Sequence, residues 1–483
     1  MLILSTLLVY FIVLMALSRL TSRHSNNDTF FRGNRQSPWY MVAFGMVGAS
    51  ISGVTFVSVP GMVMGIDMTY LQTCLGFIVG YVVVAFVLLP VYYRMNLTTI
   101  YTYLNQRLGH SAYRTGAWFF LLSKMTGAAA RFYVVCFLLH QFVLGPMGVP
   151  FILTVMAMVA LIWLYTRKGG IKTLVWTDTL QTLCMFTALM LIIIGVASAL
   201  HLDFHSTITA VTEDPHSRIF VMDDWMSRQY FWKQFLSGVF IVIVMTGLDQ
   251  DMMQKNLTCR TLREAQKDMC TYGVAFLPAN LLFLTLGILL MQLARQEGIG
   301  LPAQGDALLP MFAATGRLGD IVVVLFTLGV VASSFSSADS ALTALTTSYC
   351  VDICRQPSNE KLRRRVHMGM ALVFVAFILL FRTFNSTSII DAIYTLCSYT
   401  YGPLLGLFAF GLFTRRTARS RWVPWICICA PMVCYGIDWF ARYYAGYKFG
   451  YELLMFNGAL TFLGLYAVQE RSLQKKTPVP KNK

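Results

Sequence analysis

The sequence predicts an all-α integral membrane protein, because its composition is apolar and its apolar residues lie in long runs. Of the 483 residues, 57% are hydrophobic and only 12% are charged, whereas soluble globular proteins carry about 25% charged residues. A helix that crosses the hydrocarbon core needs about 20 consecutive, mostly apolar residues. Windows of that length predict about thirteen spans, at residues 2–20, 38–66, 69–93, 115–144, 148–166, 173–200, 230–254, 268–294, 319–353, 366–384, 388–413, 421–441 and 449–468.

The distribution of basic residues predicts the orientation of these spans. The formal net charge is +16, and most Lys and Arg residues lie in the turns that follow the odd-numbered spans and in the C-terminal tail. Cytoplasmic loops carry such an excess. We therefore expect an N-terminus outside, a cytoplasmic C-terminus and a multi-pass protein of the plasma or inner membrane. The charge indicates orientation and gives no support for a nucleic-acid partner.

The first span, residues 2–20, is interpreted as an extra N-terminal transmembrane helix. A cleaved signal peptide has basic residues before its apolar run. Here Arg19 and Arg23 follow the run, and no small-x-small cleavage site is evident.

The second and seventh spans are interrupted by small residues. The second, 38–66, carries Gly48-Ala49-Ser50-Ile51-Ser52-Gly53 at its centre, and the seventh, 230–254, carries Ser237-Gly238 and Thr246-Gly247 before Asp249. Broken helices at matching places in two halves indicate an inverted-repeat transporter, whose unwound carbonyls bind cations. The alternative is that the small residues allow close helix packing.

The fourth span carries a basic residue near its centre. Arg131 follows three alanines in the span 115–144, and its guanidinium is costly in a bilayer unless it is paired. Its fork suits a carboxylate, which belongs either to a solute or, permanently, to Asp178 or Asp339. Lys124 is expected to extend toward the cytoplasmic face.

The sixth span, 173–200, contains a carboxylate one turn inside its apolar run. An unpaired Asp178 at that depth needs a cation, a proton or an arginine. The alternatives are that Asp178 caps the helix at the interface or pairs with Lys172.

The ninth span, 319–353, has an unusual density of hydroxyl groups. Ser333, Ser336, Ser337 and Ser340 lie on one helical face by their spacing. Hydroxyl, carbonyl and carboxylate oxygens are the ligands that hard cations prefer, so this face predicts a cation site. The alternative is that these hydroxyls bond to carbonyls of their own helix.

Four motifs occur in order along the chain. Their sequences are Gly48-Ala49-Ser50-Ile51-Ser52-Gly53, Gly169-Gly170-Ile171-Lys172 with Trp176-Thr177-Asp178, Asp249-Gln250 with Gln254, and Ser336-Ser337-Ala338-Asp339-Ser340. In their order and spacing they resemble the sodium:solute symporter family over at least residues 38–405. The resemblance implies a LeuT-like core of two inverted repeats of five helices.

The resemblance also implies two sites for Na+. The main site uses the backbone carbonyls of Gly48, Ile51 and Ser333 with the hydroxyls of Ser336 and Ser337. A second sodium site would add Asp178, Asp339 and Ser340. Many relatives carry a hydroxyl where this chain has Asp339, so Asp339 either strengthens the second site or carries a proton.

The resemblance places the solute beside the broken second span. The residues expected to bind it are Ser50, Ser52, Thr55, Tyr70, Thr73 and Arg131. Carboxylate-carrying relatives use an arginine at this place, which predicts an organic acid or anion. The alternatives are a sodium-coupled sugar or other neutral-solute symporter, and a non-transporting solute sensor on the same scaffold.

The predicted organisation is one membrane domain around a transport core. The core spans residues 38–413, as halves 38–200 and 230–413, followed by two helices at 421–468 and a cytoplasmic tail at 469–483. The expected partners are sodium ions, a small solute and the lipid bilayer, with no obligate protein partner evident. No nucleophile motif or intramembrane metal cluster is evident in the sequence, so no enzyme activity is predicted.

Overall fold

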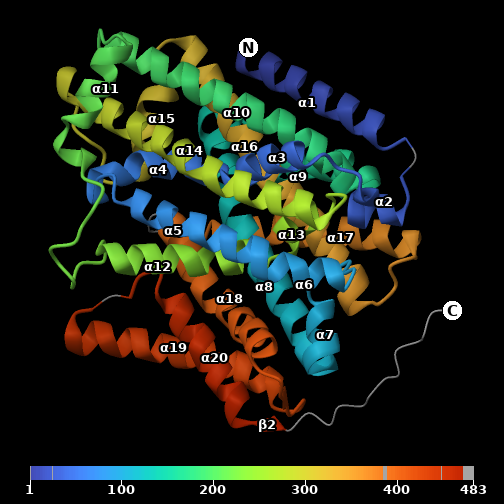
Figure 1. The fold of residues 1–483 in the computed structure, drawn as a ribbon. Helices are drawn as coiled ribbons and strands as arrows, with labels where there is room; N and C mark the ends of the chain where they lie inside the picture. Colours follow the sequence, from blue (N-terminus) through green and yellow to red (C-terminus); the bar gives the residue numbers. More distant parts are fainter. Residues whose placement is uncertain (1, 24, 384–388, 448, 471–483) are drawn as a thin grey trace.

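The computed structural model describes residues 2–23, 25–383, 389–447 and 449–470. Almost all of these residues are helical (Figure 1). The ten described helices that are long and apolar enough to cross a membrane are Leu2–Thr21, Tyr70–Arg94, His110–Leu144, Phe151–Gly169, Ile171–Ala199, Leu262–Gln296, Asp320–Ile353, Glu360–Phe381, Thr395–Phe413 and Val423–Tyr444.

Two bent helix pairs raise this number to as many as twelve. The last predicted span, 449–468, corresponds to the shorter apolar helix Leu453–Ala467. The structure therefore confirms a nearly all-helical fold with ten to twelve candidate membrane spans among the described residues. The count of about thirteen spans and the orientation of the termini stay predictions, and residues 471–483 of the predicted tail lie outside the described residues.

The first half of the chain contains the helices that surround the first break. They are α1 (Leu2–Thr21), α2 (Asn27–Arg32), α3 (Trp39–Ser50), α4 (Gly53–Ile66), α5 (Tyr70–Val83), α6 (Leu89–Arg94), α7 (Thr102–Leu108), α8 (His110–Leu139), α9 (Phe151–Gly169), α10 (Ile171–Ala199) and α11 (Phe204–Thr212). A π-helical turn, Val84–Leu88, joins α5 to α6.

The second half of the chain also contains a broken helix that is followed by long helices. Its helices are α12 (Phe231–Val242), α13 (Gln250–Asn256), α14 (Leu262–Gln296), α15 (Leu308–Ala313), α16 (Asp320–Ser348), α17 (Glu360–Phe381), α18 (Ile389–Phe413), α19 (Val423–Ala445) and α20 (Leu453–Ala467). The two short strands β1 (Thr417–Ala418) and β2 (Gln469–Glu470) pair antiparallel near the C-terminal end.

Both predicted breaks are present. The helices α3 and α4 meet at 61°, where Ile51 (ψ 83°) and Ser52 (ψ 171°) leave the helical conformation. The helices α12 and α13 meet at 70°, and Asp249 is extended between them. Each break frees backbone carbonyls in the interior of the protein.

The alternative for the small residues was close helix packing. It applies to Gly238 in the seventh span, which lies before the break. A Cβ added to Gly238 would lie 2.3 Å from the carbonyl oxygen of Thr73, and one added to Gly76 would lie 2.1 Å from that of Phe235. These two glycines let α12 and α5 approach backbone to backbone. The break itself lies further along the chain, at residues 248–249.

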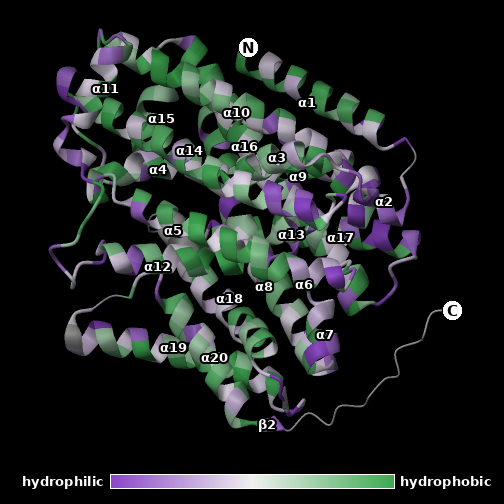
Figure 2. Ribbon diagram, viewed as in Figure 1, coloured by the Kyte–Doolittle hydropathy of each residue, from purple (hydrophilic) through white to green (hydrophobic). Residues whose placement is uncertain are grey.

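The hydrophilic residues gather at the two ends of the long helices. Figure 2 shows them around α11 at one end and around α2 and α17 at the other, with apolar helix surfaces between. Large apolar side chains such as Leu8, Phe86 and Ile194 are more than half exposed on these surfaces. This pattern is expected where lipid covers the helices.

Candidate cation and solute site

The break between α3 and α4 lies directly against the hydroxyl-rich part of α16. The Ser337 hydroxyl donates a 2.7 Å hydrogen bond to the carbonyl oxygen of Ala49. A Cβ added to Gly53 would lie 2.0 Å from Ser334 Oγ. The two places that the sequence predicted to form the main cation site are therefore adjacent.

The hydroxyls of α16 differ in what they contact. Ser333 donates to the Val330 carbonyl of its own helix at 3.1 Å, as the alternative reading expected. Ser336 instead donates to Asp178 Oδ1 on α10 at 2.8 Å. Ser337 contacts the broken helix and, at 3.3 Å, the Ser333 carbonyl. Ser336 and Ser337 thus join α16 to other helices.

The other two predicted ligands lie on the broken helix. Gly48 packs against α10 so closely that an added Cβ would be 1.9 Å from Thr182 Oγ1. Ile51 is fully buried at the break. The five residues predicted for the main sodium site are therefore gathered around one junction of α3, α10 and α16.

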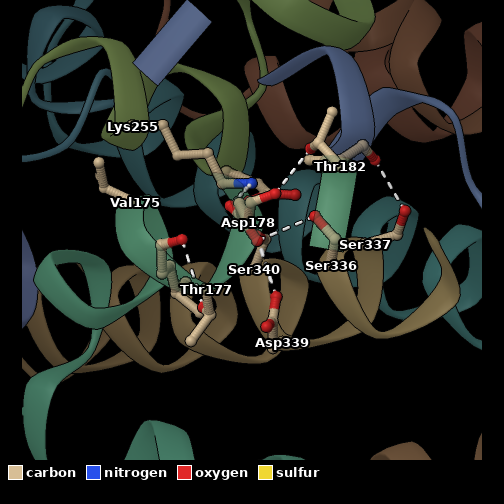
Figure 3. Close-up of polar contacts among 12 residues, drawn as sticks. Val175, Thr177, Asp178, Thr182, Lys255, Ser336, Ser337, Asp339 and Ser340 are labelled. Atoms are coloured by element: carbon tan, nitrogen blue, oxygen red, sulfur yellow. Dashed lines mark hydrogen bonds and ion pairs between the residues drawn. The ribbon is translucent and has the colours of Figure 1, made fainter. Parts of the chain in front are cut away.

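Asp178 forms a buried ion pair that no pattern in the sequence predicted. Lys255 Nζ lies 2.7 Å from Asp178 Oδ2, and the two side chains are 2% and 1% exposed. Lys255 belongs to α13 and lies beside Asp178 (Figure 3), whereas the predicted seventh span ends at residue 254. The pairing with Lys172 considered for Asp178 is therefore wrong, because the second half of the broken helix brings Lys255 to it.

The remaining residues of the predicted second site have partners of their own. Asp339 accepts hydrogen bonds from the Tyr165 hydroxyl at 2.6 Å and from Ser340 Oγ at 3.2 Å. All of these residues are buried. Among the described residues, none forms hydrogen bonds with both Asp178 and Asp339.

A cavity lies on the other side of the junction, between α3, α8 and the α12–α13 break. Its lining includes Ser50, Lys124, Arg131, Asp249, Asp251, Tyr272, Ser337 and Tyr401. The cavity therefore touches the predicted main cation site at Ser337 and the central arginine at Arg131.

Lys124 belongs to this cavity rather than to the cytoplasmic face. Its Nζ lies 2.6 Å from Asp251 Oδ2 and 3.2 Å from Asp249 Oδ2, and Tyr401 donates to the same Asp249 oxygen at 2.6 Å. The expectation that Lys124 reaches the membrane surface is wrong. The break places two carboxylates within reach of Lys124, and their pairing compensates its buried positive charge.

Arg131 lines the same cavity and is half-buried. Among the described residues, no carboxylate forms an ion pair with it, since Asp178 is paired with Lys255 and Asp339 accepts from Tyr165 and Ser340. A permanent pairing of Arg131 with either carboxylate is therefore not found.

The other predicted solute residues are not all brought together. Ser50 lines the cavity and is hydrogen-bonded to Tyr272, which also accepts from Tyr81 at 2.7 Å. Thr73 donates to Gln234 at 2.7 Å, and Tyr70 lines a separate cavity with residues such as Gln229 and Gln304. Ser52 and Thr55 are buried and lie outside the lining of the central cavity.

One sequence signal could have placed Lys124 in the cavity together with Arg131. Lys124 and Arg131 are seven positions apart, which places them on one face of α8. The small residues Gly127 and Ala128 between them line the same cavity. A face with two basic groups, opposite a broken helix that carries Asp249, indicates a paired charge cluster.

Known proteins resemble this chain in sequence. The profile of the sodium:solute symporter family matches residues 30–420. The sodium/sialic acid symporter NanT of Aliivibrio fischeri is 24% identical over 421 residues, which cover 82% of this chain and 79% of that protein. The human sodium/iodide cotransporter is 24% identical over 400 residues, covering 80% of this chain and 61% of its own length.

Solved structures resemble this chain in fold. A Na+-coupled sialic acid symporter in a substrate-bound outward-open state has a TM-score of 0.81 and 20% identity, over 97% of both chains. The nucleobase-cation-symport-1 transporter Mhp1 in a closed state has a TM-score of 0.58 and 13% identity, over 91% of this chain and 93% of its own. The family match covers most of the chain and agrees with the fold. The chain therefore belongs to the sodium:solute symporter family, whose members are transporters and not enzymes.

Proposed function

We propose that this protein imports a small organic acid together with sodium by alternating access. The observation that carries the proposal is one continuous site. Ser337 contacts the broken helix at Ala49 and lines the cavity that contains Arg131. A cation at the junction and an anion at Arg131 would lie in neighbouring parts of this site.

The sodium ion would bind where α16 meets the break between α3 and α4. The proposed ligands are the carbonyls of Gly48, Ile51 and Ser333 and the hydroxyls of Ser336 and Ser337. A bound ion would hold α16 against the broken helix, because oxygens from both elements would share it. Sodium binding would thereby favour the conformation that accepts solute.

The solute carboxylate would bind Arg131. The guanidinium has no ion-pair partner among the described residues and lines the central cavity. An arginine presents two parallel N–H groups that match a carboxylate. The similarity to symporters of sialic acid also supports an acidic solute.

Rocking of the two halves, 38–200 and 230–413, would then carry sodium and solute inward. We propose that these halves are inverted repeats, because each begins with a broken helix at the cavity. When sodium dissociates into the cytoplasm, α16 would no longer be held against the α3–α4 break, and the solute would leave.

A panel of solutes tests the proposal on the purified protein. Thermal stability is measured with each compound in sodium chloride and in choline chloride. We expect a carboxylic acid to stabilise the protein in sodium only, as a ligand of the folded state does. Arg131→Ala should lower the binding affinity for that acid by about 100-fold, because a hydrogen-bonded charge pair contributes roughly 1.5–3 kcal/mol.

Arg131→Lys is the matched control, since it keeps the charge and removes the fork. It should bind the acid with intermediate affinity. Stabilisation by neutral sugars with indifference to every acid would contradict the acid assignment and support the neutral-solute alternative. Uptake into sealed vesicles then separates a transporter from a solute sensor, which would bind without accumulation.

A further inference from the structure

We propose that the ammonium group of Lys255 is a built-in cation that takes the place of a second sodium ion, so that one sodium binds per protein. The inference rests on the proposed sodium coupling and goes beyond it by fixing the number of coupled ions. It also departs from the resemblance, which implied a second sodium site at Asp178.

The geometry of Asp178 carries the inference. One carboxylate oxygen, Oδ2, lies 2.7 Å from Lys255 Nζ, and the other, Oδ1, accepts from Ser336 at 2.8 Å. Both oxygens are therefore in use, as Figure 3 shows. A sodium ion bound by the same carboxylate would stand beside an ammonium group of like charge.

Burial makes that like-charge contact unfavourable. The side chains of Lys255 and Asp178 are 2% and 1% exposed, so little water screens them, and charges interact more strongly in such a medium. A compensating positive charge stabilises a buried carboxylate. Lys255 supplies this charge, and it is attached to the chain rather than drawn from solution.

The acidic groups near Lys255 do not provide a second sodium site in place of Asp178. The carboxylates of Asp251 and Asp339 are the next electrostatic neighbours of Lys255. Asp251 is paired with Lys124 at 2.6 Å, and Asp339 accepts from Tyr165 and Ser340. The main site is different, because no lysine or arginine nitrogen forms an ion pair or hydrogen bond with Ser337 or the Ala49 carbonyl among the described contacts.

Radioactive sodium binding to the purified full-length protein, counted per chain, tests the inference. We expect one sodium per chain in the unmodified protein. Lys255→Met should bind two, because Asp178 then needs a cation from solution. Lys255→Arg should bind one, since it keeps a tethered charge, and Lys255→Met with Asp178→Asn should also bind one, since the carboxylate charge is gone.

Two sodium ions per chain in the unmodified protein would overturn the inference and leave sodium symport intact. A single ion in Lys255→Met would also overturn it. If Lys255→Met does not fold, the counts for the unmodified protein and Lys255→Arg decide, and two ions in either contradict the proposal. No saturable sodium binding in any of these proteins would instead refute sodium coupling itself.

Discussion

Two buried lysine clusters lie at the same broken helix, and they differ in what can reach them. Lys124 with Asp249 and Asp251 lines the central cavity. Lys255 with Asp178 is sealed between α10, α13 and α16, outside that lining. The first cluster therefore faces the cavity proposed to hold the solute, and the second is buried away from that cavity.

This difference in exposure to the cavity separates the proposed binding of solute from the proposed binding of sodium, although the helix α13 contributes to both regions. The helix α13 carries Asp251 toward the cavity and Lys255 toward Asp178. A change at Lys124 should thus alter how solute is bound, whereas a change at Lys255 should alter how many ions are bound. The substitutions below test this division, from the largest expected effect to the smallest.

Lys255→Met should destabilise the protein most. It leaves Asp178 charged without a partner in a site that is almost fully buried, and breaking a buried pair in this way costs about 3–5 kcal/mol. Sodium should restore much of this stability, because a ligand that binds only the folded state stabilises it. The measurement is the melting temperature in sodium chloride and in choline chloride, with Lys255→Arg as control. Equal stabilisation of the variant and the unmodified protein by sodium would contradict the division.

Lys124→Met should destabilise the protein less, by about 1–3 kcal/mol. The Lys124 side chain is 10% exposed, compared with 2% for Lys255, so solvent in the cavity can compensate part of the lost charge on Asp249 and Asp251. Sodium should not stabilise this variant more than the unmodified protein. The same pair of melting curves checks this. A sodium response as large as that of Lys255→Met would show that both clusters take a free cation.

The sequence predicted the junction between the α3–α4 break and α16 better than it predicted either lysine cluster. The break at Gly48–Gly53 could be predicted, because several small residues interrupt one apolar span. The hydroxyl face of α16 could be predicted from its spacing alone. Both signals are local in the chain, and the structure places the two regions in contact.

The ion pairs could not be predicted, because they depend on where α13 runs after the break. The residues Gln250–Asn256 are polar, so hydropathy ends the seventh span near residue 254 and assigns Lys255 to a loop. In the structure this short helix is bent by 70° from the helix before it, and Lys255 is buried. Pairing with Asp178 depends on a fold contact between residues far apart in sequence, which no local pattern reports.

Ser337→Ala should raise the sodium concentration needed for half-maximal solute uptake by roughly tenfold. The substitution removes one proposed oxygen ligand and its contact with Ala49, which together contribute about 1–2 kcal/mol. Ser336→Ala should act in the same direction. The control is Ser334→Ala, because Ser334 is buried on the same helix and its hydroxyl has no hydrogen-bond partner among the described residues. Unchanged sodium dependence in both Ser336→Ala and Ser337→Ala would exclude these hydroxyls as ligands.

Tyr401→Phe should have the smallest effect. It tests whether a change in the cavity cluster alters solute binding without altering sodium binding. Tyr401 donates a 2.6 Å hydrogen bond to Asp249, but that carboxylate keeps its contact with Lys124, so the loss is about 1 kcal/mol. We expect solute affinity to fall by roughly fivefold with no change in the number of sodium ions bound. Solute titrations and sodium counts on one preparation measure both. A changed sodium count would mean that the cavity cluster and the Lys255–Asp178 pair respond together, because the same rigid helix α13 carries residues of both.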